Sequence, residues 1–255
     1  MLGASSLAGN LTITAAGALT NTGRLKILGT TSLAVGASHD ISLEQASNDF
    51  ADVVTVVSAN HVSLRDANAL VLGNASVSGN LSLTAGGAIS NAASNTAWTV
   101  AGTSQLPATL LSNGVNVADV TLDAAGNNFA GAVSVSARNL SLNDSNALVL
   151  GTVSLSGTAN VVAGQSLTGS GVVTVGGLAQ LKTGAGQALT LTNSANNFST
   201  VLIERAGNVS LVDASGIVLG KSSVSGTFEL AAGGSISSVG AVSYTHLTLP
   251  TNREV

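Results

Sequence analysis

The sequence predicts an all-β protein, a parallel β-helix or β-solenoid of roughly ten coils, on three observations. First, one apolar segment recurs along the chain at nearly constant spacing. Second, short stretches alternate apolar and small polar residues, which is the period-two pattern of strands with one buried face. Third, the stretches lack the helical crossovers of βαβ units and regular two-residue Asn-Gly hairpin turns. Many short strands without such connections are expected to stack as parallel coils.

An apolar segment that ends in Leu-Gly marks each repeat. Ala69–Gly73 returns at Ala147–Gly151 and at Gly216–Gly220, and the chain opens on Met1-Leu2-Gly3 as if in a further copy. The glycines of these copies are 70, 78 and 69 residues apart. Units that repeat in this way pack on their neighbours. We therefore expect a single β-helix over residues 1–242, with repeats at 1–71, 72–149 and 150–218 and a partial repeat at 219–242.

Alternating stretches within the repeats justify the strand assignment. Leu occupies every second position of Asn80–Thr84 and Asn139–Asn143. Helix is disfavoured because Gly, Asn, Ser and Thr occur throughout, and these residues cost backbone entropy or compete for its hydrogen bonds. With three coils of roughly 23 residues per repeat, a spacing of ~4.8 Å predicts a rod about 50 Å long. Phe50, Phe129 and Phe198 are then expected to fill one corner, three coils apart.

Composition excludes several classes of function. Only 8% of the residues are charged, the formal net charge is −4 and the pI is near 5.1. Nucleic-acid binding requires clustered Lys and Arg, so we expect no nucleic-acid partner. No apolar run approaches the roughly 20 residues that span a bilayer, so we expect no transmembrane segment in this fragment. The absence of cysteine excludes disulfides and thiolate metal sites.

Residues 243–255 differ in composition from the repeats. They contain the only Tyr, one of the two Pro and one of the three His, and they match no repeat. This string resembles the translated sequencing-adaptor tails found on open reading frames from metagenomic assemblies. We therefore expect a non-native or disordered tail, with a genuine C-terminal tail as the alternative. The repeats also begin and stop in mid-pattern, which predicts a piece of a longer protein.

An insertion in repeat two is the candidate binding segment. Leu19 precedes Phe50 by 31 residues, whereas Ile89 precedes its equivalent Phe129 by 40. The enlarged segment contains Trp98, the only Trp, and Pro107, the only Pro before residue 243. An insertion in a solenoid is expected to leave the coil as a surface loop, where binding tends to reside. The alternative is a bulged coil whose Trp packs in the core.

The ionisable residues do not predict a catalytic or metal site. Asp66 recurs as Asp144 and Asp213, each as a single acid before a turn, so a turn-forming role is favoured. A calcium site would instead gather Asp66 with the nearby acids, which are Asp40, Glu44, Asp49 and Asp52. No Gly-x-Ser-x-Gly elbow accompanies His39 and His61. We therefore expect no catalytic residue, no metal and no cofactor.

The repeat pattern resembles the repeats of large bacterial exoproteins of the filamentous haemagglutinin type. It runs from Asn-x-Phe through alternating Val to Asp-x-x-x-Leu-x-Leu-Gly and Gly-Asn-Leu-x-Leu-x-Ala-Gly-Gly-x-Ile, with Asn80–Ile89 as the best copy, and it covers residues 1 to about 242. The resemblance implies a right-handed parallel β-helix, export across the Gram-negative outer membrane by two-partner or autotransporter (type V) secretion, and a role in adhesion or biofilm. The secretion domain and the translocator barrel of that family are missing from this sequence, which leaves the export route open.

The resulting hypothesis is a non-catalytic stalk segment of a secreted, surface-exposed adhesin. Its expected partners are a host-cell or surface receptor or glycan and, during export, an outer-membrane transporter. The alternative is a carbohydrate-active β-helix enzyme of the polysaccharide lyase kind, with acids and bases on one face. Arg65, Arg138 and Arg205 occur once per repeat, about three coils or ~14 Å apart, which is too far for a shared site. A third class, an ice- or mineral-binding solenoid, requires a regular Thr ladder, and the Thr residues here are irregular.

Overall fold

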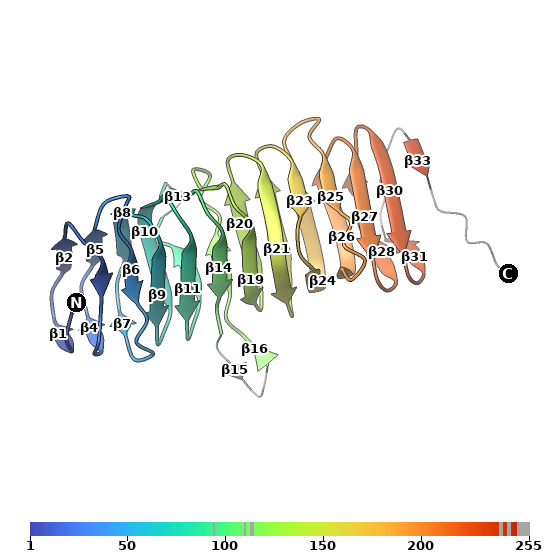
Figure 1. Ribbon diagram of the computed structural model, residues 1–255. Helices are drawn as coiled ribbons and strands as arrows, with labels where there is room; N and C mark the ends of the chain where they lie inside the picture. Colours follow the sequence, from blue (N-terminus) through green and yellow to red (C-terminus); the bar gives the residue numbers. More distant parts are fainter. Residues whose placement is uncertain (94, 110, 113–114, 240–241, 244–245, 249–255) are drawn as a thin grey trace.

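The computed structural model is a stack of parallel β-strands, and it describes residues 1–93, 95–109, 111–112, 115–239, 242–243 and 246–248. Figure 1 shows the strands following one another along one axis in sequence order, from the blue N-terminal end to the red strands of the last repeat. Among the described residues there is no helix. The predicted all-β solenoid is confirmed, with about eleven turns where the sequence predicted roughly ten.

Two long ladders of parallel strands run the length of the stack, and each turn contributes one strand to each ladder (Figure 1). Ladder 1 consists of β2 (Leu11–Thr14), β5 (Thr31–Ala34), β8 (Val54–Ala59), β10 (Leu70–Val77), β12 (Ile89–Asn91), β17 (Val120–Leu122), β20 (Leu140–Asp144), β22 (Ala159–Ala163), β24 (Val173–Lys182), β26 (Asn197–Arg205), β28 (Ile217–Leu219) and β31 (Ile236–Ser238). Ladder 2 consists of β3 (Leu19–Thr20), β6 (Ile41–Leu43), β9 (Val62–Asp66), β11 (Leu81–Ala85), β14 (Ser104–Pro107), β19 (Val133–Ala137), β21 (Leu148–Leu155), β23 (Leu167–Gly169), β25 (Leu189–Leu191), β27 (Val209–Asp213), β30 (Thr227–Ala232) and β33 (His246–Thr248).

Alternate side chains of both ladders form one aliphatic core. In β20, for example, Leu140 and Leu142 are buried and Ser141 between them is only half-buried. Because successive side chains of a strand point to opposite faces, the period-two pattern of the sequence separates inside from outside. The core is mostly Leu, Val, Ile and Ala, and its largest fully buried side chains are Trp98, Phe50, Phe129, Phe198 and Phe228.

Successive repeats are rotated by half a turn about the long axis. Val54, Val133 and Val201 are equivalent residues, because each pairs with the Leu that precedes the Gly of the Leu-Gly segment. Val54 and Val201 nevertheless lie in ladder 1, whereas Val133 lies in ladder 2. Seven strand pairings lead from β8 to β26, so two repeats complete seven turns. Each repeat therefore makes three and a half turns instead of the predicted three, because a turn averages about 21 residues and not 23.

A short third ladder changes sides with every repeat. In repeat one it consists of β1 (Ser5–Leu7), β4 (Leu25–Ile27) and β7 (Asp49–Phe50), on the path from ladder 2 to ladder 1. In repeat two it consists of the end of β10, β13 (Trp98–Val100) and β18 (Asn128–Phe129), on the path from ladder 1 to ladder 2. In repeat three the short ladder lies again on the path from ladder 2 to ladder 1, where the starts of β24 and β26 stack on the end of β21. In the last, partial repeat, β29 (Ser222–Ser223) and β32 (Val242–Ser243) lie on the path from ladder 1 to ladder 2.

The three repeated phenylalanines do not share one corner. Each is buried where the short ladder of its repeat ends. Because that ladder alternates, Phe50 and Phe198 lie on one side of the stack, seven turns apart, and Phe129 lies on the other. The expectation of a single corner was wrong, since the half-turn per repeat is invisible in the spacing of the phenylalanines.

A buried Asn and a buried Asp recur in each repeat and join neighbouring turns. In repeat two, Asn127 Oδ1 accepts the backbone N–H of Trp98 at 3.1 Å, and Asn127 Nδ2 donates to the Leu122 carbonyl at 3.0 Å. Asp144 accepts the backbone N–H of Phe129 at 2.7 Å. The same bonds are made in the other two repeats by Asn48, Asp66, Asn196 and Asp213. We call each such pair the Asn–Asp lock.

The aspartate of the lock also forms the turn that follows its strand. Asp144 Oδ1 accepts the backbone N–H of Asn146, two residues further on, at 2.7 Å, and Asp66 and Asp213 make the equivalent bond. This contact is an Asx turn, so the turn-forming role predicted for the recurring acid is confirmed. Burial raises the pKa of Asp66 and of Asp144, against the opposing effect of the N–H donors.

Spin labels can test the half-turn rotation. Ser63, Ser141 and Ser210 occupy equivalent, half-buried positions of the three repeats. Ser63 and Ser210 lie in ladder 2, whereas Ser141 lies in ladder 1. With cysteines introduced in pairs, we expect about 34 Å between backbones at 63 and 210, which are seven turns apart. Pairs that include position 141 should each exceed half that distance, because they cross the core. Double electron–electron resonance measures all three distances between labels. If the label at 141 lies midway on the straight line between the labels at 63 and 210, the rotation is refuted.

Removal of one lock should destabilise the stack. Asn127→Ala leaves the buried N–H of Trp98 and the buried carbonyl of Leu122 without partners, so we expect a loss of about 2–4 kcal/mol in the free energy of unfolding. Asn128→Ala is the matched control, because Asn128 is only half-buried and its side chain makes no hydrogen bond to the described residues. Urea denaturation followed by circular dichroism compares the two; equal losses would contradict this role of Asn127.

Candidate functional site

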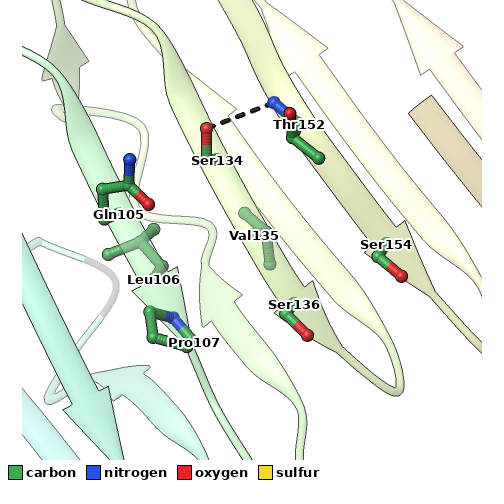
Figure 2. Close-up of a pocket in the computed structure, with 8 residues that line it drawn as sticks. All are labelled: Gln105, Leu106, Pro107, Ser134, Val135, Ser136, Thr152 and Ser154. Carbon is green, nitrogen blue, oxygen red and sulfur yellow. Dashed lines mark hydrogen bonds between the residues drawn. The ribbon is translucent and has the colours of Figure 1, made fainter. Parts of the chain in front are cut away.

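A shallow depression of about 270 Å³ lies on the outer face of ladder 2, over β14, β19 and β21. Figure 2 shows its lining as three short rows of side chains on neighbouring strands. Gln105 and Pro107 come from β14, Ser134 and Ser136 from β19, and Thr152 and Ser154 from β21, with Leu106 and Val135 beneath them. We call this depression the hydroxyl groove.

A β-bulge at the Leu-Gly segment shapes one wall of the groove. Val133 pairs with Leu150, but Val135 pairs with Val153, so Gly151 and Thr152 together oppose Ser134. The backbone N–H of Thr152 donates to Ser134 Oγ at 3.2 Å (Figure 2). A Cβ at position 151 would lie 2.3 Å from that oxygen, which only glycine avoids. In repeats one and two the recurring glycine, Gly73 or Gly151, therefore marks a bulge where a hydroxyl of the preceding turn approaches the backbone.

Small side chains on the central strand keep the groove open. Ser134 and Ser136 follow Val133 in the positions that Leu202 and Glu204 occupy after the equivalent Val201 in repeat three. In repeat one the residue equivalent to Ser134 is Thr55, which also lies against the bulge glycine, Gly73. The residues at these positions are larger in the other two repeats, so the serines of repeat two leave more room over this strand.

The groove offers hydrogen bonds without charge. Its four hydroxyls both donate and accept, and the Gln105 amide carries two donors and one acceptor oxygen. The Pro107 ring is the apolar surface at one end. None of the eight lining residues is ionisable, so the site is suited to hold a neutral polar ligand and not to transfer protons.

The structure separates the two residues singled out in the insertion. Pro107 is half-buried and lines the groove, so its predicted part in binding stays a prediction. Trp98 is 0% exposed, and its Nε1–H donates to the Gly73 carbonyl at 2.6 Å. The indole therefore has no surface for a ligand, and the alternative of a Trp packed in the core describes its position.

The extra residues of repeat two leave the stack as a hairpin. Ile89 of β12 pairs with Val120 of β17, 31 positions later, which is the longest turn among the described strands. Within it, β15 (Leu111–Ser112) and β16 (Val115–Asn116) form the one antiparallel pair of the described residues. Figure 1 shows this hairpin projecting from the stack below β14. Residues 110 and 113–114 of the insertion lie outside the described residues.

The acidic residues considered for calcium serve local roles. Within the described ranges, no three His, Cys, Asp or Glu side chains gather where a metal could bind. Asp40 Oδ1 accepts the backbone N–H of His61 at 3.0 Å, and this bond lowers the pKa of Asp40. His61 Nδ1 in turn accepts the backbone N–H of Asn80 at 2.8 Å. Side chains of successive turns thus form a row of hydrogen bonds at this corner. The row continues through Asn80 Oδ1, which accepts the backbone N–H of Thr103.

The three arginines are dispersed. Arg65 lies on β9 of ladder 2, and Arg138 follows β19 of the same ladder three turns later. Arg205 is the last residue of β26 in ladder 1. Arg138 makes a bidentate ion pair with Asp119, with Nε at 2.9 Å and Nη2 at 2.6 Å from the two carboxylate oxygens. The acid–base convergence that a polysaccharide lyase needs is therefore not formed by these residues.

The Asp119–Arg138 pair predicts a pH-dependent stability difference. Hydrogen bonds from the Arg138 guanidinium lower the pKa of Asp119, with burial opposing them. A lowered folded-state pKa stabilises the fold above the unfolded carboxyl pKa, and this contribution is lost as the pH falls through the folded value. Asp119→Asn should therefore cost up to about 1 kcal/mol at pH 7. The urea midpoints of the wild type and of Asp119→Asn at pH 7 and pH 3 measure this cost. If the difference between the two proteins does not shrink at pH 3, the ion pair is not its source.

The groove and the bulge were missed by sequence reasoning. The signal for the bulge was present, because an isolated glycine inside a strand pattern indicates a bulge or a close backbone approach. Nothing in the sequence placed Gln105, Ser134 and Thr152 on three consecutive turns, since that juxtaposition depends on the unequal lengths of those turns.

Comparison with known proteins identifies the repeats but not their activity. Four segments match a family described as repeats of unknown function (DUF5649), at residues 1–57, 59–136, 137–203 and 206–252. No curated protein and no solved structure matches the chain. Within the described residues, no helix has the length and apolar character needed to cross a membrane.

Proposed function

The chain belongs to this family of repeats of unknown function, and we propose that it is a non-catalytic β-helical stalk of a large, secreted, surface-exposed bacterial adhesin of the filamentous haemagglutinin type. The observation that carries the proposal is the uninterrupted stacking of two parallel ladders over one aliphatic core. Such a stack has no intrinsic limit of length. Each added turn lengthens the rod by ~4.8 Å, which suits a spacer that holds a binding end away from a cell.

Several features support export to the cell surface. Charged residues make up only 8% of the chain and there is no cysteine, so folding buries few ionisable side chains, mainly the lock aspartates, and forms no disulfide. A solenoid can fold turn by turn, because each turn contacts mainly its neighbours. We propose that the chain crosses the Gram-negative outer membrane unfolded through a dedicated transporter and then folds outside, each turn on the preceding one.

The hydroxyl groove is the proposed contact point for a receptor. Its uncharged hydroxyls and the Gln105 amide suit a neutral polar partner, such as a surface glycan or an uncharged stretch of a receptor protein. The hairpin β15–β16 belongs to the same insertion and follows directly on β14, which forms one wall of the groove. In this proposal, repeat two contributes binding and the other repeats contribute length.

Localisation in the bacterium that carries the gene tests the proposal. Antibody raised against the purified chain should label intact, unpermeabilised cells or detect the chain in the medium, and external protease should remove the label. A cytoplasmic protein stained in parallel is the control for cell integrity. Deletion of the responsible outer-membrane transporter should retain the chain inside and reduce adhesion to host cells or surfaces. A chain found only inside wild-type cells would contradict the proposal.

A further inference from the structure

The outer face of ladder 1 is free of charge over most of its length. From β2 to β22, its outward positions hold Ser, Thr, Asn, Val and Ala, and no Asp, Glu, Lys or Arg. We call this surface the neutral face. Charged side chains bound it at its far end, where Lys182 and Glu204 form an ion pair on β24 and β26. Others lie elsewhere, such as Arg24 with Asp49 beside the short ladder and Arg138 with Asp119 at a corner.

A sheet face without charge is unusual for a surface meant to stay in water. Soluble proteins keep charged side chains of both signs over their surfaces and so avoid association with other copies. Here one face of eight strands lacks this protection. On ladder 2, Arg65 of β9 and Glu229 of β30 bound a shorter uncharged stretch, and the hydroxyl groove interrupts it. This distribution indicates that the neutral face meets another surface.

The hydroxyls of the neutral face have no partners within the molecule. The side chains of Ser32, Thr55, Ser90, Thr121 and Ser141 are half-buried and make no hydrogen bond to the described residues. Ser78 Oγ, by contrast, donates to the Ala37 carbonyl at 2.7 Å. The neutral face therefore retains unused donors and acceptors.

A second copy of this chain is the occupant that fits this face best. A hydroxyl both donates and accepts, so a row of hydroxyls is complementary to another such row. Val71, Ser90, Thr121 and Ser141 pair in register on consecutive turns, which sets a spacing of ~4.8 Å. An identical rod has the identical spacing, so one alignment matches all turns at once. A glycan would gain no aromatic platform here, because Trp98 is buried and the outward side chains of the face include no Phe, Tyr or Trp.

The area of the face sets the expected strength of the contact. Eight strands at ~4.8 Å and about five residues at ~3.3 Å give roughly 600 Å² per partner. Specific interfaces bury about 800 Å² per partner, and weak or transient ones lie below about 600 Å². The neutral face is therefore large enough for a reversible dimer and too small for an obligate one.

We propose that two copies of this chain associate side by side through their neutral faces, with the hydroxyls of Ser90, Thr121 and Ser141 at the centre of the contact. Association of neighbouring stalks by this face would bundle rods on one cell or join rods of two cells. This inference rests on the geometry and composition of ladder 1 and not on the proposed adhesin function. The localisation test and the association test can therefore fail independently.

Sedimentation velocity of the purified chain between about 1 and 200 μM tests the proposal. We expect a concentration-dependent equilibrium between monomer and dimer, since an interface of this size is typical of weak association. Ser90→Arg and Thr121→Arg each place a charge in the contact and should weaken dimerisation at least tenfold. Circular dichroism before each run establishes that the variants are folded.

Ser82→Arg is the matched control. Ser82 lies on β11 of ladder 2, in the same turn as Ser90, and it is likewise half-buried with an unbonded side chain. It should leave the dimer unchanged. A chain that stays monomeric at 200 μM, or equal weakening by Ser82→Arg and Ser90→Arg, would overturn the proposal. Glycan binding by a monomeric chain that is lost in Thr121→Arg would also overturn it, in favour of a glycan on this face.

Discussion

The Asn–Asp lock is the interaction on which the register of the stack depends. The core consists of aliphatic side chains that differ little in shape, so packing alone would tolerate a slip of one turn against the next. The locks prevent this, because Asn127 and Asp144 together satisfy three buried backbone groups that lie on the turns around the short ladder of repeat two. Displacement of one turn would leave those groups unpaired in the core, at a cost of about 1–3 kcal/mol each. One lock per repeat is sufficient, since the turns between locks are held by continuous strand pairing.

The half-turn of each repeat gives the rod two comparable sides. Equivalent segments occur in ladder 1 and ladder 2 alternately, so neither face is built from one segment of the repeat alone. A local change in one repeat therefore appears on one side only. In repeat two, Ser134 and Ser136 and the inserted hairpin make the outer face of ladder 2 distinct, while ladder 1 at the same height remains a neutral sheet. The alternation lets a repetitive chain carry the hydroxyl groove and the neutral face, the two proposed contact surfaces, at the same level without overlap.

Small, uncharged side chains connect the fold with both proposals. They allow the bulge glycine Gly151 to approach Ser134 and so shape the groove. They also leave the sheet faces flat, with donors and acceptors at a regular spacing. Three ion pairs among the described residues, such as Arg138 with Asp119, join neighbouring turns without covering the neutral face. The described exterior thus consists of extended, mostly uncharged sheet faces.

The sequence by itself determined the repeats, the alternation of inward and outward residues, the turn role of Asp66, Asp144 and Asp213, and the place where extra residues leave the stack. These features are local, because strand alternation and Asx turns depend on residues close together in the chain. Only the tertiary structure decided the half-turn per repeat, the opposite position of Phe129, the burial of Trp98 and the groove beside Gly151. These depend on which residues pair across a turn, and turns vary from 17 residues between Val133 and Leu150 to 31 between Ile89 and Val120. Since the free energy of stacking is shared among many similar aliphatic contacts, the sequence pattern does not reveal those lengths, and the pairing of whole strands sets them.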